Sequence, residues 1–359
     1  MIEPLNADQL VANALQETGL DDFGGDSYRE GLDVLVRDYN AGLAKGWMNQ
    51  QGRDMCGRDS QHYLTRRLLV TDYLKSHADL TAAPIEKPVI VMGIPRTGTT
   101  LLSNLLAADP ARRSPLTWEI DEPVPPAEKG MLTSDPRALA RLEQERKILE
   151  MAPGVAKYYR GSAIYPNECV FFLAHDFKSL MIESKGRLPE YREFVFNCDM
   201  TSAYSYHRTF LQLLQANNGG VWNLKMPSHS LHLDALMAEY PDARLIWTHR
   251  DPLTAIGSFC SLIRFAFSMS TDEPPLDWIA ENCVWQAQHH AGRVMDFRDR
   301  YGEERVIDVH YADLVNEPIA TMKTLYAALG DDFTPAANAG MQGWLDDNPP
   351  SATIACPLT

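Results

Sequence analysis

Hydrophobic residues recur at intervals of three and four among charged ones over residues 7–80, which is the spacing of amphipathic helices. The recurring positions are Leu10, Leu15, Leu32, Leu35, Val36, Leu64, Leu68, Leu69 and Leu74. Pro84 and Pro88 then interrupt the pattern, and proline ends helices because it lacks a backbone N–H donor. We therefore expect an N-terminal helical extension over residues 1–84, followed by one larger domain over residues 85–359.

Beyond residue 84, short apolar runs alternate with longer helical patterns. Runs typical of strands buried on both faces occupy residues 89–92, 221–225, 244–248 and 306–309. Helical patterns occupy residues 99–106, 137–150, much of 165–215, a segment from about 230, and 319–329. This alternation predicts an α/β fold, a three-layer sandwich in which helices cover both faces of a mostly parallel central sheet.

Charge excludes one class of partner. The 359 residues include 33 basic and 48 acidic side chains, which gives a net charge of −15. Such a chain lacks the broad basic surface of a nucleic-acid binder, so we expect no nucleic-acid partner. Any anionic ligand must therefore meet a local positive pocket.

The cysteines and the N-terminus bear on the compartment. The cysteines are scattered without a C-x-x-C pair, so neither a zinc ribbon nor a disulfide framework is expected. The N-terminal sequence MIEPLNADQL carries acidic residues where a secretory signal has a basic and then an apolar segment. No stretch approaches the ~20 apolar residues of a membrane span. We expect a protein of the reducing cytoplasm with no transmembrane segment.

The apolar run at 89–92 leads into a glycine-containing loop and then a helix. Gly93 and Gly98 have the G-x-x-x-x-G spacing of a phosphate-binding loop, but Thr99 stands where that motif has lysine. Backbone N–H groups at the start of the helix can still hold an anion, and Arg96 is the nearest cation that replaces the lysine. The pattern therefore predicts a site for a terminal anion that differs from an ATP γ-phosphate. The alternative is a plain chain reversal between strand and helix.

This loop resembles the 5′-phosphosulfate loop of sulfotransferases that use 3′-phosphoadenosine 5′-phosphosulfate (PAPS). The similar residues are 94–102, and the resemblance implies that Arg96, Thr97, Gly98, Thr99 and Thr100 bind the donor. It also implies that PAPS is the co-substrate and adenosine 3′,5′-bisphosphate (PAP) the product.

A second segment agrees with this resemblance. Residues 244–252 resemble the family strand that ends in an arginine, here Arg250, and Ser258 lies eight positions later, where family members bind the 3′-phosphate. Segments 224–229 and 310–314 follow the order typical of the bacterial branch. The resemblance extends over about residues 8–330 and implies that residues 85–359 form a single sulfotransferase domain.

Sulfuryl transfer requires a base for the acceptor hydroxyl, positive charge around the sulfonate and a firmly held leaving group. None of these requires a metal. The resemblance implies that Glu119 is the general base and that Lys225, with Arg96, stabilises the transferring group. The alternatives for Glu119 are a helix cap or a pair with Arg113, and Glu122 is the near competitor for the base.

Histidines supply a further candidate base. His229 lies four residues after Lys225, and its alternative role is packing at the start of a helix. Three other histidines have no spacing typical of metal ligands and are expected to be structural. They are His232, His289 and His290.

Three of the implied site residues have simpler interpretations. Lys225 has the alternative of an ordinary surface lysine, and Arg250 that of an ion pair with the adjacent Asp251. Tyr311 resembles a family tyrosine near the nucleotide, and the other interpretation is a buried core tyrosine.

The C-terminus departs from the family pattern. Sulfotransferases commonly end in a basic, glycine-containing segment that closes over the 3′-phosphate, whereas no basic residue follows Lys323 here. Two other functions stay open, the second of them because of this C-terminus. A P-loop kinase or NTPase is disfavoured by Thr99 and by the lack of an acidic strand-end residue for magnesium. The other is a non-catalytic nucleotide-binding protein.

The resemblance implies that the acceptor is a small molecule with a hydroxyl group, and the sequence identifies neither this molecule nor the oligomeric state. Residues 165–215 are rich in aromatic rings, most of which core packing explains. The remainder favour an apolar or phenolic acceptor. The rings are those of Phe171, Phe172, Phe177, Tyr191, Phe194, Phe196, Tyr204 and Tyr206.

Overall fold

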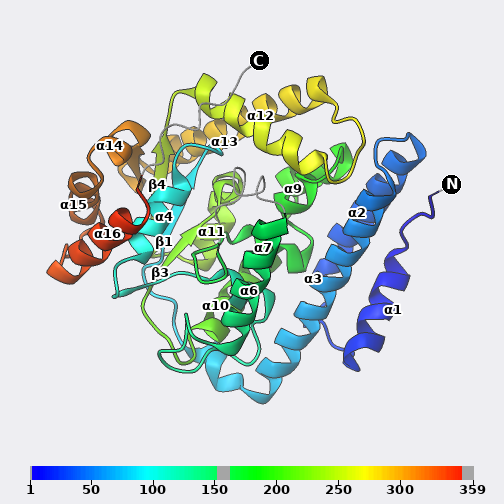
Figure 1. Cartoon of the computed structure of the whole chain (residues 1–359), viewed down its shortest axis with the longest axis horizontal. Helices are drawn as coiled ribbons and strands as arrows, with labels where there is room; N and C mark the ends of the chain where they lie inside the picture. Colours follow the sequence, from blue (N-terminus) through cyan, green and yellow to red (C-terminus); the bar gives the residue numbers. More distant parts are fainter. Residues whose placement is uncertain (1, 152–161, 350–359) are drawn as a thin grey trace.

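A five-stranded parallel sheet forms the centre of the larger part of the chain (Figure 1). The computed structural model describes residues 2–151 and 162–349. The strands lie in the order β2-β3-β1-β4-β5, and each adjacent pair is parallel. They are β1 (Val89–Gly93), β2 (Arg112–Arg113), β3 (Val221–Lys225), β4 (Arg244–His249) and β5 (Val306–His310). Four of the five were predicted, and β2, with two residues, is too short to show a pattern.

The central strand β1 is buried along its whole length. Alternate side chains of a strand point to opposite faces of a sheet, and β1 follows this rule with apolar residues on both faces. Val89 and Val91 belong to one apolar core, whereas Ile90 and Met92 belong to another. The continuous apolar run at 89–92 therefore reflects a strand with helices on each side.

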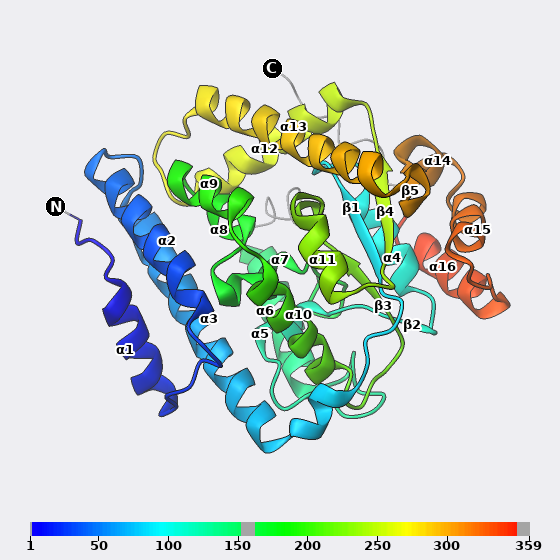
Figure 2. The same ribbon diagram turned by 180° about the vertical axis from the view of Figure 1, so that it is seen from behind.

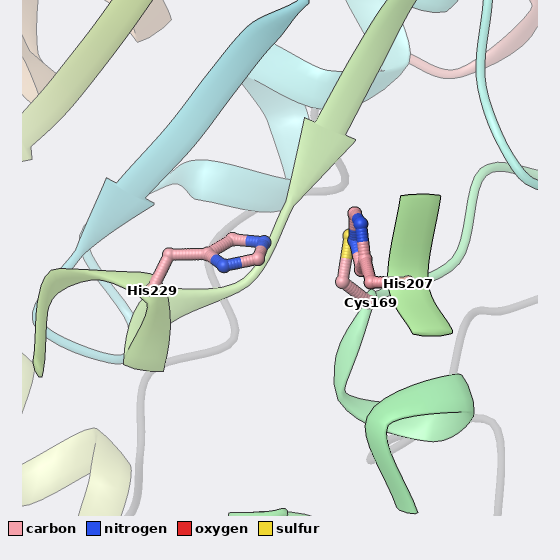
Figure 3. A group of neighbouring side chains, drawn as sticks. All are labelled: Cys169, His207 and His229. Atoms are coloured by element: carbon pink, nitrogen blue, oxygen red, sulfur yellow. The ribbon is translucent and has the colours of Figure 1, made fainter. Parts of the chain in front are cut away.

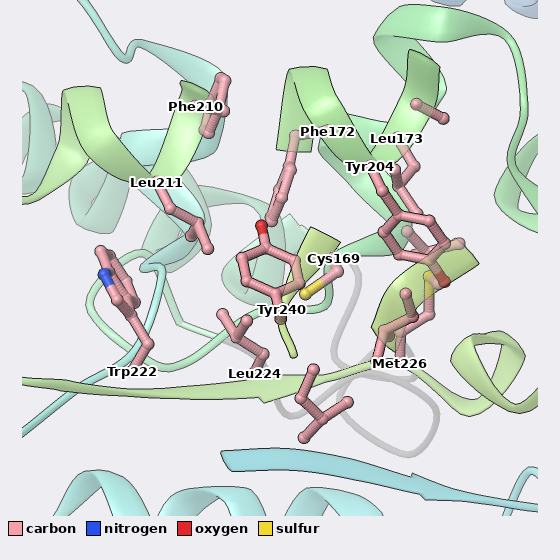
Figure 4. Close-up of a cluster of buried hydrophobic side chains, with 14 of the residues drawn as sticks. Cys169, Phe172, Leu173, Tyr204, Phe210, Leu211, Trp222, Leu224, Met226 and Tyr240 are labelled. Carbon is pink, nitrogen blue, oxygen red and sulfur yellow. The ribbon is translucent and has the colours of Figure 1, made fainter. Parts of the chain in front are cut away.

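Helices cover both faces, which confirms the predicted three-layer sandwich (Figures 1 and 2). On the face of Val89 and Val91 lie α4 (Thr99–Ala107), α14 (Tyr311–Asn316), α15 (Pro318–Leu329) and α16 (Pro335–Asp347). On the face of Ile90 and Met92 lie α7 (Val170–Leu173), α10 (Thr201–Leu214), α11 (Leu233–Glu239) and α13 (Leu276–Tyr301). Figure 4 shows Trp222 and Leu224 of β3 beneath Phe172, Phe210 and Leu211 on this second face.

The N-terminal residues form helices, as their periodicity predicts. These are α1 (Ala7–Thr18), α2 (Ser27–Ala44) and α3 (Gln50–Ser76), followed by the 3-10 helix η1 (Ala78–Ala82). Their apolar faces share a core with Phe177, Tyr191 and Val195 from the following part of the chain. The boundary near residue 84 stays a prediction, and close packing crosses it.

The remaining helices complete the described part of the chain. The α-helices are α5 (Thr117–Asp121), α6 (Pro136–Met151), α8 (Leu180–Glu183), α9 (Pro189–Asn197) and α12 (Pro252–Phe267). The 3-10 helices are η3 (Ala174–Asp176), η4 (Pro227–His232) and η5 (Glu303–Arg305). The helix predicted from about residue 230 thus begins at Leu233, because a 3-10 turn over Pro227–His232 precedes it. No helix among the described residues is both long and apolar enough to cross a membrane.

Most aromatic rings of residues 165–215 pack in the core, as their simpler interpretation predicts. Six of the eight are buried, and Phe171 and Phe194 are half-buried. The buried ones are Phe172, Phe177, Tyr191, Phe196, Tyr204 and Tyr206.

A buried carboxyl joins α8 to α13. Glu183 is 1% exposed, and its oxygens accept hydrogen bonds from the amides of Asn282 (2.8 Å) and Gln286 (3.1 Å). Burial raises the pKa of Glu183 to about 7, although the two amide hydrogen bonds lower it. The protonated acid is therefore the form that the folded chain favours up to about neutral pH.

This carboxyl makes stability depend on pH in a stated direction. The folded-state pKa of Glu183 lies above its unfolded value of 4.5. The contribution of Glu183 to the free energy of unfolding is therefore complete below pH 4.5 and is lost as pH rises through about 7. The full loss is about 3 kcal/mol. Glu183→Gln removes this pH dependence. In urea unfolding between about pH 5 and 8, the free energy of unfolding of the variant should therefore rise relative to that of the wild type as pH rises. Glu190→Gln, at an exposed position on α9, is the matched control, and parallel profiles for Glu183→Gln and the wild type would contradict the assignment.

Candidate functional site

The loop between β1 and α4 presents the start of a helix to the carboxyl edge of the sheet. Gly98 is the N-cap residue of α4, with φ of 98°. Among the described residues no side chain caps this helix, and its first turn carries no acid. The first N–H groups of α4 and the positive end of its dipole are thus available to an anion. Arg96 also has a positive φ, 75°, and such backbone strain gathers at functional sites.

Both loop glycines are required by close neighbours. A Cβ at Gly98 would lie 2.7 Å from Cδ2 of Tyr311. A Cβ at Gly93 would lie 2.6 Å from Oγ1 of Thr97 and would also contact Oγ1 of Thr248. The spacing of the two glycines therefore reflects tight packing of the loop against β4 and the start of α14, as well as chain reversal.

Arg96, Arg250, Ser258 and Tyr311 come together beside this loop, although up to 215 positions separate them in the sequence. Nε of Arg96 donates to Oγ of Ser258 (2.9 Å), and Nη1 of Arg250 donates to the carbonyl of Arg96 (2.9 Å). The Arg250 guanidinium lies over the Tyr311 ring, 4.3 Å from its centroid. The two segments that resemble the phosphosulfate loop and the 3′-phosphate site are thus in contact.

The simpler interpretations of Arg250 and Tyr311 fit less well. Asp251 caps α12, where its carboxylate accepts from the N–H of Thr254 (2.8 Å) and from its hydroxyl (2.6 Å). Tyr311 is half-buried and has the guanidinium of Arg250 on its face. Both residues therefore face the loop.

The threonines of the loop divide into two groups. Thr97 is 2% exposed, and its hydroxyl pairs with the carbonyl of Ile94 (2.7 Å) and with the hydroxyl of Thr248 (2.6 Å). Thr99 is also buried, whereas Thr100 is exposed. Thr97 thus braces the loop against β4, and Thr100 faces solvent at the start of α4.

Lys225 ends β3 and forms a close pair that the sequence did not predict. Its ammonium lies 2.5 Å from Oε1 of Glu168, and its own side chain is 5% exposed against 29% for Glu168. The N–H of Cys169 donates to the Lys225 carbonyl (3.0 Å), which fixes Glu168 next to the strand end. Lys225 pairs in register with Val91 of the neighbouring strand β1. Val91 lies two residues before Gly93, where β1 ends and the glycine loop begins, so Lys225 lies near the start of this loop. An ordinary surface lysine does not fit this burial.

Glu119 has the contacts of its alternative role. It is 1% exposed; Oε1 accepts from Arg113 (2.5 Å) and Oε2 from the N–H of Leu116 (3.1 Å) at the start of α5. Burial raises the pKa of Glu119, against the opposing effect of Arg113. Glu119 as base stays a prediction, and these contacts describe a capping carboxylate paired with Arg113. Glu122, its near competitor, is exposed at the end of α5.

His229 is enclosed in the core beyond Lys225. It is fully buried in η4, with its Nδ1 3.0 Å from the hydroxyl of Tyr204. Burial lowers the pKa of His229 well below its usual value. His229 as base stays a prediction, and its environment agrees with the packing role. The other histidines make structural hydrogen bonds: His232 with the Val195 carbonyl, His289 with the Trp285 carbonyl and His290 with Ser230.

A cavity of about 440 Å³ lies one helical turn from Glu168. The N–H of Phe171 donates to the Glu168 carbonyl (3.3 Å), and the half-buried Phe171 ring lines the cavity together with Trp118 and Ile120.

The C-terminal residues 350–359, including Cys356, lie outside the described residues. They belong to the segment after Lys323 in which the sequence predicts no basic lid, and the described part of this segment ends just after α16.

Known proteins resemble this chain in sequence. A profile of the sulfotransferase family matches residues 88–335. Two mycobacterial proteins, from Mycobacterium bovis and Mycobacterium tuberculosis, are both named omega-hydroxy-beta-dihydromenaquinone-9 sulfotransferase Stf3. Each is 24% identical over 267 residues, which cover 68% of this chain and 63% of the relative. The chain thus spans less than two thirds of the length of these relatives.

Two solved structures resemble the fold over nearly all of the chain. The sulfotransferase STF9 from Mycobacterium avium has a TM-score of 0.89 and 37% identity, over 96% of this chain and 88% of its own. The sulfotransferase STF1 from Mycobacterium tuberculosis has a TM-score of 0.86 and 30% identity, over 95% of this chain and 94% of its own.

The packing of Gly98 against Tyr311 makes the loop sensitive to one methyl group. Gly98→Ala places a Cβ 2.7 Å from the tyrosine ring at a backbone φ of 98°, which costs on the order of 1–3 kcal/mol and displaces the loop. We expect binding of PAP to weaken at least ~10-fold, measured by calorimetry, while the circular dichroism spectrum stays that of the wild type. Gly257→Ala on α12, where a Cβ meets nothing within 4 Å, is the control. Unchanged affinity in Gly98→Ala would show that the loop does not hold the nucleotide.

Proposed function

The chain belongs to the sulfotransferase family, and we propose that it transfers a sulfuryl group from PAPS to a hydroxyl group of a small acceptor. The observation that carries this proposal is the contact between Arg96, Arg250, Ser258 and the glycine loop at one edge of the sheet. In an open parallel sheet, ligands bind outside the carboxyl ends of the strands. In a chain with net charge −15, two guanidinium groups and an uncapped helix start at this edge form a local anion site.

The residues present fit a donor with two separate anionic groups. The N–H groups at the start of α4, with Thr100, would hold the 5′-phosphosulfate end, and Arg250 with Ser258 would hold the 3′-phosphate. A planar guanidinium suits a phosphate because it donates two parallel hydrogen bonds. When bound, PAPS supplies the sulfuryl group, and PAP is the leaving group. A kinase or NTPase is the weaker alternative because Thr99 replaces the lysine of the phosphate-binding loop.

Lys225 provides positive charge next to the transferring group. Its ammonium is buried at the end of β3, level with Val91 of β1, and Arg96 lies in the loop that follows β1. Charge fixed in a protein interior stabilises the negative charge that develops on the sulfonate oxygens more strongly than water does. We assign this role to Lys225 together with Arg96 and the loop amides.

We assign the general base to Glu168 in preference to Glu119. Glu168 is partly exposed and bonded to Lys225, whereas both oxygens of Glu119 are occupied inside the core. In the assigned step the acceptor hydroxyl gives its proton to the Glu168 carboxylate while its oxygen forms the bond to sulfur. The bond between sulfur and the phosphate oxygen of the donor breaks, and the electron pair leaves with PAP.

The cavity beside Phe171 is the proposed acceptor site. Trp118, Ile120 and Phe171 form its apolar part, and Phe171 lies one turn from Glu168. The rest of the lining is mostly charged and includes Arg58, Asp59, Arg66, Asp121, Glu122, Arg137, Arg141 and Lys185. The relatives named Stf3 carry in their name a hydroxylated menaquinone, which supports an apolar acceptor with a terminal hydroxyl. A phenolic acceptor fits the same rings. The expected cytoplasmic location and a reaction without metal stay predictions.

Arg250 tests the donor half of the proposal. Arg250→Ala removes a charge-assisted phosphate contact worth about 1.5–3 kcal/mol, so the KM for PAPS should rise about 10- to 100-fold with little change in the KM for the acceptor. Arg250→Lys restores part of the loss. The control is Arg300→Ala. Arg300 lies in the last turn of α13 and forms an exposed ion pair with Asp234 of α11. Equal effects on both KM values would count against the assignment of the 3′-phosphate site.

Matched substitutions separate the two candidate bases. Glu168→Gln keeps an oxygen for Lys225 but cannot take a proton, so kcat should fall by about 10²- to 10⁴-fold. Its melting temperature should fall less than that of Glu119→Gln, because Glu168 is partly exposed whereas Glu119 is not. Glu119→Gln leaves the buried Arg113 without its charged partner, so the melting temperature should fall while kcat of the folded enzyme stays within about tenfold. Steady-state kinetics and thermal unfolding of both variants decide between them. A large loss of kcat in Glu119→Gln alone, without loss of stability, would return the base to Glu119.

A further inference from the structure

Three side chains able to bind a metal meet inside the core (Figure 3). Cys169 lies at the start of α7, His207 on α10 and His229 in η4. Each side chain is fully buried, and the cysteine sulfur and one nitrogen of each imidazole all lie within 4.8 Å of one another. These residues come from segments up to 60 positions apart, so only the fold brings them together.

In each imidazole, one nitrogen is within hydrogen-bond distance of a tyrosine hydroxyl, and the other has no hydrogen-bond partner among the described residues. Nδ1 of His207 is 2.6 Å from the Tyr240 hydroxyl, and Nδ1 of His229 is 3.0 Å from the Tyr204 hydroxyl. Nε2 of each ring is buried and has no hydrogen-bond partner among the described residues. A buried polar atom left in this way costs about 1–3 kcal/mol, and this core has two of them beside a thiol.

This arrangement has the features of a first and a second ligand shell. Histidines that bind metals almost always use their other nitrogen in a hydrogen bond that sets the tautomer and the ring orientation. In the tautomer that suits a metal ligand, the tyrosine oxygens accept from Nδ1–H, and the lone pair is left on Nε2 of both rings. The thiol of Cys169 supplies the third donor.

We propose that Cys169, His207 and His229 bind one Cu(I) ion. A thiolate with two imidazoles is a donor set that soft ions select, Cu(I) and Zn(II) among them, and a trigonal Cys-His-His set is typical of copper. Charge separates the two ions. With one thiolate, Cu(I) forms a neutral complex, whereas Zn(II) leaves a net positive charge in a core that buries Tyr204, Phe172 and Tyr240 around it. An uncompensated buried charge costs several kcal/mol.

Binding requires a small contraction and the loss of one proton. Metal bonds of about 2.0–2.3 Å to nitrogen and sulfur place three donors in one plane roughly 3.6 Å apart. The donor atoms now lie within 4.8 Å of one another, so the longest distance between two donors must shorten by about 1 Å. The S–H bond of Cys169 breaks and its proton goes to solvent. One bond from sulfur and two from nitrogen form to the ion, and no electron is transferred.

The ion would join the parts of the chain that carry the proposed catalytic pair. Cys169 directly follows Glu168, and His229 lies four residues after Lys225. The complex would therefore tie the start of α7 to η4 and hold the Glu168 and Lys225 backbones in place. This consequence rests on the proposed function, whereas ion binding itself does not.

The test is an anaerobic titration of the purified full chain with Cu(I) held by a coloured chelator. We expect the protein to remove one equivalent of Cu(I), and Cys169→Ser to bind it at least ~100-fold more weakly. Cys283→Ser, which changes a buried cysteine in a different apolar cluster, should bind like the wild type. Equal binding by Cys169→Ser and the wild type would overturn the proposal, as would Zn(II) binding that Cu(I) fails to displace.

A spectroscopic measurement on the wild type decides the matter even where a variant fails to fold. X-ray absorption of the one-to-one copper complex should show one sulfur and two nitrogen neighbours of Cu(I). Neighbours that are only nitrogen or oxygen, or the absence of a one-to-one complex, would show that the two Nε2 atoms are satisfied by something other than this ion.

Discussion

Pairing of β1 with β3 on one side and β4 on the other fixes where every candidate residue lies. The register sets Val91 beside Lys225 and Gly93 beside Thr248. The loop after β1 therefore emerges between the lysine at the end of β3 and Arg250 just beyond β4. Because β1 is apolar on both faces and wholly buried, its position cannot shift without exposing two cores. Burial of one short strand thus sets the geometry of the site.

The site replaces one missing lysine with groups from several elements. Thr99 leaves the glycine loop without the lysine of a nucleoside triphosphate site. Arg96 within the loop, Arg250 just beyond β4 and Lys225 at the end of β3 supply positive charge at this edge of the sheet. The Tyr311 ring packs against the guanidinium group of Arg250 and against Gly98. The proposed donor has anionic groups at two positions, a phosphosulfate at one end and a phosphate at the other, and cations from several elements suit both of them.

Sequence patterns predicted the elements well and the contacts only in part. Apolar runs predicted four of the five strands to within one residue, because strands buried on both faces leave a continuous signal. The pair of Arg250 and Ser258 was found through family resemblance, and the structure adds their contact with Arg96. Glu168 was missed because its partner lies 57 positions away and a single acid in a loop carries no periodicity. Whether a carboxylate such as Glu119 is buried depends on packing that no local pattern encodes.

Selectivity for a nucleotide with a 3′-phosphate is the property that distinguishes the proposed donor site from a nucleoside triphosphate site. Calorimetric titration of the wild-type chain with PAP, and separately with ADP and magnesium, measures this selectivity. We expect PAP to bind selectively, because the 3′-phosphate assigned to Arg250 and Ser258 is a group that ADP lacks. Equal or tighter binding of magnesium ADP would overturn the assignment and would favour a kinase or NTPase.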